Sequence, residues 1–533
     1  MPELVIGSMA NLGLDRLVKG ILVGFLPSQR NHAAYVFIHA RLNESFRAGK
    51  TKSIEARKEQ LVKLAYMIKD NISALQDAIF ADLGRPKLES DFLEIHQLLK
   101  DVVNAHKSVE KWAKPEKVPF VLDTAAMKPV VRKEPKGVVL IIGAFNYPLW
   151  LTIGPLIGAI AAGCATIIKP SELSLTTSSL LTSLVTKYLD PNFVAIVNGG
   201  IPETTRLLDL PWGHILYTGG AKVGRIIATA AAKHLTPVTL ELGGKNPVVI
   251  DPNSDLKLAA RRILWGKASN AGQTCVAPDY VLVPEEGQDA FVKELVAVHK
   301  EFYPEGPKTS NSYARIISHA HFDRLKGMLD STKGTIVLGG TDDADREQKF
   351  IAPTIVKDVR PDDALMQSEI FGPILSILPV KNLDAAIRYI NSNDHPLALY
   401  VFSQDPYFKS KVFDNTQSGS AIANDLIIHL GIGGLPFGGV GPSGYGAHRE
   451  KFSFDMFTHN RSSLDSPGWA DLILSARFPP YTDAKAKKLA SFGPRTLPFP
   501  RPGTARRTSW TKWVVVMGLL SIMSAALIKY RRK

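Results

Sequence analysis

Hydrophobic positions along the chain follow two different spacings. From residue 54 to 83 apolar side chains recur at intervals of three or four residues, which predicts one long amphipathic helix. After Lys136 the pattern changes to short, continuous apolar runs that end in Gly or Pro. These runs cover residues 137–143, 165–170, 193–200, 214–220 and 237–244. Stretches with helical spacing separate them, so the pattern predicts βαβ units around a parallel sheet.

A second series of the same kind begins near residue 247 and continues to about 440. It contains an apolar run at 247–250, a helical stretch over 254–268 and another run at 280–284. Residues 461–512 are rich in Pro and predict a linker or cap. The body of the chain is therefore expected to be α/β, with more than one core.

The net charge of +14 changes this picture little, because its excess lies in the C-terminal segment. Eight Lys or Arg and no acidic residue occur from Arg501 to Lys533, which leaves a net charge of +6 for the rest. The body contains no basic helix interleaved with aromatic residues, so we expect no nucleic-acid partner.

The same segment contains sixteen uncharged residues, 513–528, between Lys512 and Lys529. A helix of this length spans about 24 Å, slightly less than the ~30 Å hydrocarbon core of a bilayer. The alternative is a buried terminal helix, but the only polar residues are Ser521 and Ser524. We expect a C-terminal transmembrane anchor. Because it leaves the ribosome last, the catalytic body should face the cytosol.

The number and spacing of the cysteines limit the disulfides and metal sites that the chain could form. Cys164 and Cys275 are the only two cysteines, too few for a disulfide framework, and no Cys/His cluster predicts a metal. Cys275 lies in NAGQTCVAPDY, whose composition is that of a loop. This segment alone leaves a reactive thiol and an inert buried thiol equally open.

Polar residues also follow two of the predicted strands, at the edge where parallel sheets bind ligands. In YTGGAKVG, Gly219, Gly220 and Gly224 could form a phosphate-binding turn before a helix. In IIKPSE, Lys169 and Glu172 could contact a ribose or a phosphate. An ordinary glycine turn and a solvated strand end are the alternatives.

Two more polar residues stand beside apolar strands. Asn146 in GAFNYP could donate a hydrogen bond to a developing oxyanion. Glu241 in LELGGKNP is either outward-facing or partly buried, and burial would raise its pKa toward that of a general base. Together with Cys275, this set is sufficient to oxidise an aldehyde through a thioester.

In the order of the chain, seven segments resemble the aldehyde dehydrogenase superfamily. They are FNYP, IKPSELS, YTGGAKVG, TPVTLELGGKNP, NAGQTCVAP, QSEIFGPILSI and LPFGGVGPSGYG. The resemblance covers roughly residues 38–465, and SFDMFTHNRS is similar to class 3, the branch with membrane-anchored fatty aldehyde dehydrogenases. The chain is also similar to fungal dehydrogenases that oxidise an apocarotenal, such as beta-apo-4'-carotenal.

The resemblance implies a role for each catalytic candidate. Cys275 would be the nucleophile, Asn146 and the backbone N–H of Cys275 the oxyanion hole, and Glu241 the base that activates water. The implied reaction is NAD(P)-dependent oxidation of an apolar aldehyde, either a fatty aldehyde or an apocarotenal. An inactive fold kept as a membrane-bound binding protein, or an acyl-thioester reductase, is the alternative.

For the cofactor, the resemblance implies that Lys169 and Glu172 contact the adenosine ribose and that the turn from Gly219 to Gly224 faces the cofactor. Glu369 and Phe371 in EIFGP would contact the nicotinamide ribose. Glu172 would repel a 2′-phosphate, which favours NAD, while NADP stays possible. Gly220 departs from the family pattern, in which many members have Asn or Ser.

The predicted fold class is α/β, with a Rossmann-like parallel-sheet cofactor domain, an α/β catalytic domain and a C-terminal transmembrane helix. The predicted parts are an N-terminal extension (1–37), the cofactor domain (38–114 and 138–244), the catalytic domain (245–440), bridging or oligomerisation segments (115–137 and 441–465), a Pro-rich cap or linker (466–512) and the anchor (513–528). A homodimer is expected.

Overall fold

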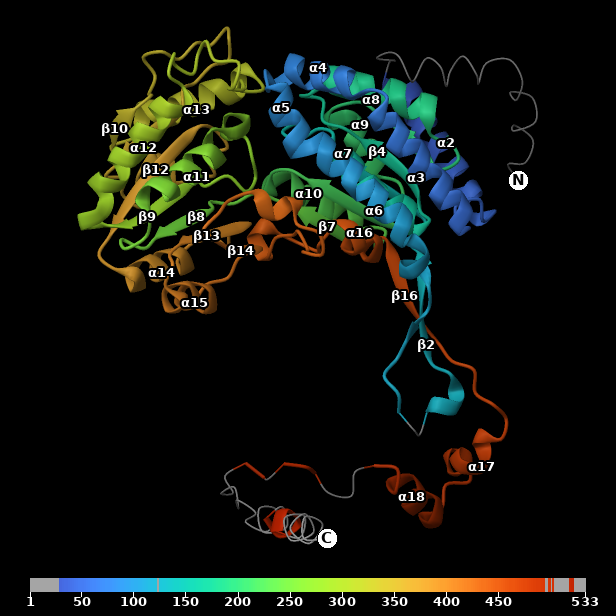
Figure 1. Ribbon diagram of the computed structural model, residues 1–533. Helices are drawn as coiled ribbons and strands as arrows, with labels where there is room; N and C mark the ends of the chain where they lie inside the picture. The colour runs from blue at the N-terminus through green and yellow to red at the C-terminus, as the bar shows by residue number, and fades with distance from the viewer. Residues whose placement is uncertain (1–27, 122–123, 494–496, 500, 503–516, 522–533) are drawn as a thin grey trace, which may run out of the picture. The chain divides into compact units, whose positions relative to one another are not determined.

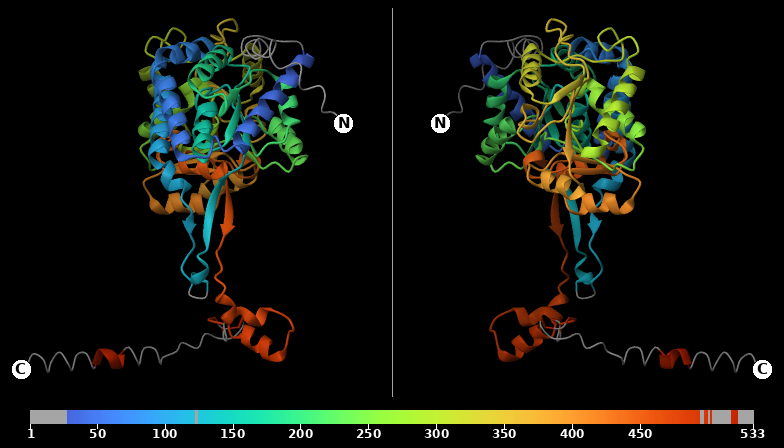
Figure 2. Two further views of the ribbon diagram at one scale, coloured as in Figure 1. Left: turned by 90° about the vertical axis from the view of Figure 1, so that its right-hand side faces the viewer. Right: turned by 90° about the vertical axis from the view of Figure 1, so that its left-hand side faces the viewer.

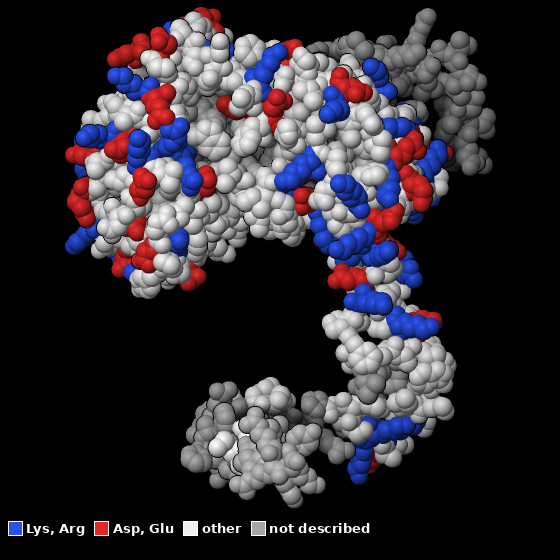
Figure 3. Space-filling view, in the orientation of Figure 1, with Lys and Arg blue, Asp and Glu red and all other residues white. Residues whose placement is uncertain are grey.

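The computed structural model describes residues 28–121, 124–493, 497–499, 501–502 and 517–521. The chain divides into two compact units, one from residues 1–118 and 130–463 and the other from residues 119–129 and 464–533. The first unit contains a six-stranded, a seven-stranded and a three-stranded sheet. Both Lys/Arg and Asp/Glu are interspersed over the face of this unit drawn in Figure 3.

The six-stranded sheet has the order β15-β7-β6-β3-β4-β5. Its strands are β3 (Val138–Ile142), β4 (Ala165–Lys169), β5 (Val194–Ile196), β6 (His214–Thr218), β7 (Val238–Glu241) and β15 (Gly444–Tyr445). β3 to β7 are parallel, as the sequence predicts, and β15 adds an antiparallel edge. All five residues of β3 are buried because helices cover both faces, which explains the continuous apolar runs.

Two layers of helices enclose this sheet (Figure 1). One face carries α7 (Trp150–Ala162), which contacts β3 and β4, with α3 (Ile54–Lys69) and α6 (His96–Ala113) packed against it. The other face carries α2 (Ser28–Arg47), α9 (Ile201–Leu208) and α10 (Ala221–Ala232). The remaining helices of this region are α4 (Ile72–Leu83), α5 (Lys87–Ser90), a π-helical turn (Asp91–Ile95) and α8 (Leu175–Tyr188).

The single helix predicted over residues 54–83 is wrong. The chain forms α3 and α4 with a break at Asp70 and Asn71. The Asn71 side chain donates to the carbonyl of Met67 at 2.8 Å. Asp and Asn favour such local hydrogen bonds over continued helix, and the apolar spacing carries no signal for them.

The seven-stranded sheet has the order β10-β11-β12-β9-β8-β13-β14. Its strands are β8 (Pro247–Ile250), β9 (Tyr280–Pro284), β10 (Thr335–Leu338), β11 (Thr354–Lys357), β12 (Ile374–Val380), β13 (Ala398–Phe402) and β14 (Ser420–Ala423). All pairs are parallel except β10 with β11. The flanking helices are α11 (Leu256–Ala268), α12 (Gln288–Phe302), α13 (His319–Ser331), α14 (Leu383–Asn391) and α15 (Pro406–Asp414).

An antiparallel three-stranded sheet and a short helix complete the first unit. Its strands are β1 (Glu116–Lys117), β2 (Val130–Pro135) and β16 (Thr458–Ser463), and the helix is α16 (Glu450–Met456). Figure 2 shows β2 and β16 side by side. Their residues line up from Thr458 opposite Pro135 to Ser463 opposite Val130.

The second unit contains α17 (Ala470–Leu474) and α18 (Asp483–Ala490). Among the residues that the structure describes, no helix is long and apolar enough to cross a membrane. The predicted anchor at 513–528 lies outside the described residues except for 517–521, which are helical, and most of the predicted extension at 1–37 lies outside them as well. The predicted domain boundaries stay predictions.

Candidate active site

Cys275 lies in the loop that leads into β9, at the amino ends of the parallel strands of the seven-stranded sheet. The Asn246 amide donates to the carbonyls of Cys275 at 2.8 Å and Ala277 at 2.9 Å, while its oxygen accepts from the Ala398 N–H. The Tyr400 hydroxyl donates to the Val276 carbonyl at 2.6 Å. These contacts hold the loop rigidly, and the Cys275 side chain faces a cavity.

Glu241 and Asn146 come from the opposite direction, from the carboxyl ends of strands of the six-stranded sheet. Glu241 is the last residue of β7, and Asn146 follows β3 after a short turn. Each is 2 % exposed. At the site, the carboxyl ends of the strands of the six-stranded sheet therefore face the amino ends of the strands of the seven-stranded sheet. The three predicted catalytic residues lie at this junction.

Of the two alternatives for Glu241, the structure shows the buried one, and burial raises the pKa of this carboxyl group well above its ordinary value. Both carboxylate oxygens are without a hydrogen-bond partner among the described residues. An ionised carboxylate is therefore poorly stabilised here, and this is the condition in which a carboxylate binds a proton strongly.

The environment of Cys275 does not favour the thiolate form that the nucleophile implied by the family resemblance needs. Burial raises the pKa of Cys275 to about 12, and the negative charges of Glu369 and Glu241 add to the shift. At neutral pH the thiol is therefore protonated in this structure. A nearby positive charge or a proton acceptor is needed before the sulfur becomes nucleophilic.

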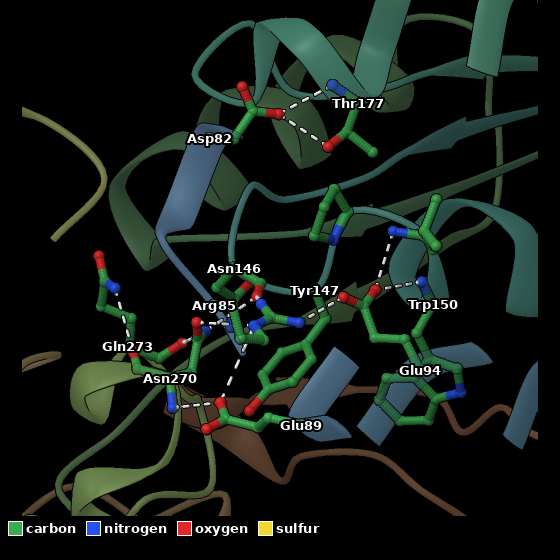
Figure 4. A network of polar contacts seen from close by, with 12 residues as sticks. Asp82, Arg85, Glu89, Glu94, Asn146, Tyr147, Trp150, Thr177, Asn270 and Gln273 are labelled. Carbon is green, nitrogen blue, oxygen red and sulfur yellow. Dashed lines mark hydrogen bonds and ion pairs between the residues drawn. The ribbon is translucent and has the colours of Figure 1, made fainter. Parts of the chain in front are cut away.

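A buried network fixes the backbone of Asn146 (Figure 4). The Arg85 guanidinium is 0 % exposed, donates through Nη2 to the Asn146 carbonyl and pairs through Nη1 with Glu94. Its Nε donates to Asn270 Oδ1 at 3.0 Å, and Asn270 Nδ2 donates to the same Asn146 carbonyl at 2.9 Å. Glu89 accepts from the Asn270 N–H at 2.6 Å. We call Arg85, Glu89, Glu94, Asn146 and Asn270 the Arg85 network.

The Arg85 network also reaches the helix and the loop that frame the site. Glu94 Oε2 accepts from the N–H groups of Leu149 and Trp150 at the start of α7, where a carboxylate satisfies otherwise unpaired donors. Asn270 has a φ of 52°, in a left-handed turn five residues before Cys275. Gln273 donates to the carbonyls of Asn270 and Arg315, which anchors this turn from its other side.

Sequence reasoning missed Asn246 and the members of the Arg85 network other than Asn146. Asn270 and Gln273 stand inside NAGQTC, where two amides beside a loop cysteine were an available signal. Arg85 gives no comparable signal, because an arginine after a glycine is ordinarily exposed.

The predicted cofactor residues fit a dinucleotide. Lys169 ends β4 and lies 3.1 Å from Glu172 Oε2 and 2.7 Å from the Gly199 carbonyl. Gly220 precedes α10, whose first N–H groups are capped by no side chain that the structure describes. A Cβ on Gly220 would meet nothing within 4 Å, so space remains for a ligand phosphate. A Cβ on Gly224 would lie 2.9 Å from Leu242, so Gly224 lets α10 approach the sheet closely.

Glu369 and Phe371 also reach the junction. A Cβ on Gly243, two residues after Glu241, would lie 2.2 Å from Glu369 Oε2, so only glycine permits this approach. Burial and the charge of Asp279 raise the pKa of Glu369 to about 7. The Phe371 ring contacts the Phe145 ring, next to Asn146, at 5.9 Å between centroids. The structure therefore brings EIFGP beside all three catalytic candidates.

A cavity of about 390 Å³ is lined in part by Cys275, and its volume lies within the size range of small-molecule sites. Its wall is predominantly apolar, and its opening is marked by Ile428 and Ile432, which are 40 % and 47 % exposed. The lining residues are Phe92, Leu93, His96, Gln97, Lys100, Tyr147, Trp150, Leu151, Cys275, Ile427, Ile428, Leu430, Gly431 and Ile432.

Comparison with known proteins agrees with this geometry. Residues 29–462 match the model of the aldehyde dehydrogenase family. The chain is 46 % identical over 440 residues to a dimeric NADP-preferring aldehyde dehydrogenase of Rattus norvegicus, which covers 83 % of this chain and 96 % of that protein. It is also 46 % identical over 445 residues to aldehyde dehydrogenase family 3 member A2 of Mus musculus, covering 84 % and 91 %.

Among solved structures, the substrate-bound AldH of Staphylococcus aureus superimposes with a TM-score of 0.82 at 41 % identity, covering 85 % of this chain and 98 % of that one. Enzymes of this family use NAD or NADP. The order of the motifs, the meeting of Cys275, Glu241 and Asn146, and the identity to family 3 members lead to one conclusion. The chain belongs to the aldehyde dehydrogenase family and is an aldehyde dehydrogenase of its family 3 branch.

Proposed function

We propose that this aldehyde dehydrogenase oxidises long, apolar aldehydes to carboxylic acids, with fatty aldehydes and apocarotenals as candidate substrates. The observation that carries the proposal is the predominantly apolar cavity that Cys275 lines. An aldehyde carbon beside the sulfur would leave its hydrocarbon chain against Leu93, Trp150 and Leu430. Each buried methylene contributes about 0.8 kcal/mol, so such a wall selects for chain length.

In this proposal the Cys275 sulfur attacks the aldehyde carbon, and the thiol proton passes to a water molecule. The Asn146 amide and the Cys275 N–H stabilise the resulting oxyanion, and the Arg85 network keeps the Asn146 backbone in place for this task. A bound nicotinamide cofactor would supply the hydride acceptor, and the acyl group would then be held on Cys275 as a thioester. Glu241 then takes a proton from water as the oxygen of that water attacks the acyl carbon, and the carboxylic acid leaves Cys275.

The cofactor would be held by Lys169 and Glu172 at the adenosine ribose, by the turn at Gly219 and Gly220, and by Glu369 at the other end. Use of NADP is supported by the name of the rat relative and by the Lys169 cation beside the ribose position. Glu172, with 49 % of its side chain exposed, has room to turn away from a 2′-phosphate.

We also propose a homodimer and a C-terminal membrane attachment through residues 513–528, with the catalytic body on the cytosolic side. The printed name of the rat relative, "dimeric", supports the first. The uncharged segment between Lys512 and Lys529 supports the second. A tether would raise the local concentration of enzyme where a lipid-soluble aldehyde collects.

The test is NADH or NADPH formation against hexanal, hexadecanal and a C35 apocarotenal, with wild type and the variant Leu93→Trp. Filling the cavity at Leu93 should lower kcat/KM for the two long aldehydes roughly tenfold, about the value of two methylenes, and leave hexanal within about twofold. Leu88→Trp, at a position 81 % exposed and outside the cavity, is the matched control. Equal losses on all three substrates would contradict a chain-binding cavity.

A further inference from the structure

Two buried side chains behind the site face each other without hydrogen bonds. His448 Nε2 lies 3.9 Å from Glu241 Oε1, and the two side chains are 3 % and 2 % exposed. Nε2 and both carboxylate oxygens are unpaired among the described residues. Buried polar atoms in native proteins nearly always have a partner, so three unpaired atoms at one place call for an explanation.

The backbone conformation around residues 444–450 positions His448 beside Glu241. Gly444 of β15 pairs with Glu241 of β7, and the chain then turns to bring His448 behind the carboxylate. Arg449 and Glu450, the next two residues, have φ angles of 87° and 44°, a conformation that non-glycine residues rarely adopt. Such strain persists where the surroundings enforce it, and it is concentrated at functional sites.

The surroundings decide the charge state of His448. Its ring lies 6.1 Å from the Trp150 ring and 5.4 Å from the Phe437 ring, between centroids. Burial lowers the pKa of His448 to about 3, and the positive charge of Arg449 adds to the shift. The other charged groups nearby are Asp101, 3.6 Å from Arg449, and Glu450, which lines the same small cavity as His448. His448 is therefore neutral at physiological pH and has one N–H to donate.

We propose that His448 is the positioning residue of Glu241 and donates its Nε2–H to the ionised carboxylate while Glu241 acts as the base. Shortening the 3.9 Å separation by about 1 Å gives an ordinary hydrogen bond. The proton removed from water goes to Glu241, and His448 keeps its own proton throughout. This inference rests on the proposed function, in which Glu241 activates water.

The consequence concerns pH. A donor to the ionised form lowers the pKa of a carboxyl group, so loss of the donor should raise the pKa of Glu241 further. The base is active when ionised, and the acid limb of the deacylation rate should then move to higher pH. Loss of packing alone would lower the rate at every pH and leave the limb in place.

The experiment compares His448→Phe, which cannot donate, with His448→Gln, whose amide can. The burst of NADH and the steady-state rate on hexanal are measured from pH 6 to 9.5 in the full-length enzyme. We expect the burst to be retained in both variants. In His448→Phe the acid limb should move up by about one pH unit, with roughly tenfold loss of the steady-state rate at pH 7. In His448→Gln it should stay within about 0.3 unit of wild type.

An unmoved limb in His448→Phe, or an equal displacement in both variants, would overturn the donor role. If thermal denaturation shows that His448→Phe is not folded, His448→Met replaces it. Methionine is smaller than phenylalanine and also lacks a hydrogen-bond donor. Glu241→Gln is the reference. If it deacylates as fast as wild type, the proposed role of Glu241 is wrong. If it is slow while the His448 variants keep the wild-type limb, only this inference is wrong.

Discussion

Cys275 lies between a region of apolar side chains and a region of carboxylate side chains. We call the cavity wall of Phe92, Leu93, Trp150, Ile427 and Leu430 the substrate side, and the region of Glu241, Gly243, Asp279 and Glu369 the cofactor side. The substrate side is apolar and opens at the surface. On the cofactor side, burial raises the pKa values of Glu241 and Glu369.

This difference assigns the choice between aldehyde substrates to the substrate side and the proton transfers of the reaction to the cofactor side. An apolar wall discriminates between aldehydes by the area that they bury, in small increments per methylene. Buried carboxylates act on protons, and a pKa shift of one unit changes the population of the active form up to tenfold. Changes on the cofactor side or at the sulfur should therefore affect every aldehyde, whereas changes on the substrate side should affect long ones.

The largest effect is expected from removal of the Cys275 sulfur, which lies between the substrate side and the cofactor side. Cys275→Ser should lower turnover on short and long aldehydes by about 10⁴-fold or more, because a hydroxyl ionises far less readily than a thiol. Cofactor binding, followed by fluorescence titration, should be unchanged. Cys164→Ala is the matched control, since Cys164 is fully buried beside the Phe457 carbonyl and should tolerate the change with little kinetic effect. Residual activity above a tenth of wild type would exclude Cys275 as the nucleophile.

Next, Glu241→Gln should remove the general base of the cofactor side and leave the substrate side unchanged. Hydrolysis of the acyl-enzyme should slow by at least about 10²-fold, the usual contribution of a general base. Stopped-flow measurement should then show a burst of NADH close to the enzyme concentration before a slow steady state, with hexanal and hexadecanal alike. The control Glu134→Gln changes an exposed ion pair with Arg461 and should behave as wild type. A uniformly slow reaction without a burst would place Glu241 before hydride transfer.

Arg85→Lys tests whether the Arg85 network positions Asn146. Lysine keeps the charge but lacks the planar fork that reaches Asn146, Asn270 and Glu94 at once. A misplacement of about 1 Å costs on the order of 10²-fold in rate, so kcat should fall by roughly that factor with cofactor affinity retained. Arg57→Lys is the control, because Arg57 is 6 % exposed and binds backbone carbonyls of Ala161 and Lys52. If both variants lose stability and neither loses kcat, the network only supports the fold.

The smallest effect, per pH unit, is the pH dependence of the reactivity of Cys275 itself. Because its pKa is raised to about 12, the thiolate fraction should grow by up to about tenfold per pH unit across pH 6 to 9. The alkylation rate with iodoacetamide, measured without cofactor in Cys164→Ala, reports this directly. The rate should rise over the whole range without levelling off. A plateau near pH 7 would mean that the thiolate is already stable at rest.

Several elements could be predicted from the sequence because local rules govern them. The runs at 138–142 and 214–218 are strands whose apolar residues are buried on both faces, and the helices near 150–162 and 221–232 follow from their spacing. The break at Asn71 escaped the apolar pattern, since a side-chain hydrogen bond ended the helix there. The roles of Cys275, Glu241 and Asn146 came from the motifs and the family resemblance, and they stay predictions until tested.

What the sequence by itself determined is therefore the α/β class, the parallel strands and the motif residues, since each depends on neighbours a few positions away. The tertiary structure alone decided that the carboxyl ends of one sheet face the amino ends of the other. It also joined Arg85 to Asn270, 185 residues apart, and placed His448 3.9 Å from Glu241. Hydrogen bonds and burial between distant segments leave no periodic trace in the chain, because they depend on packing rather than on spacing.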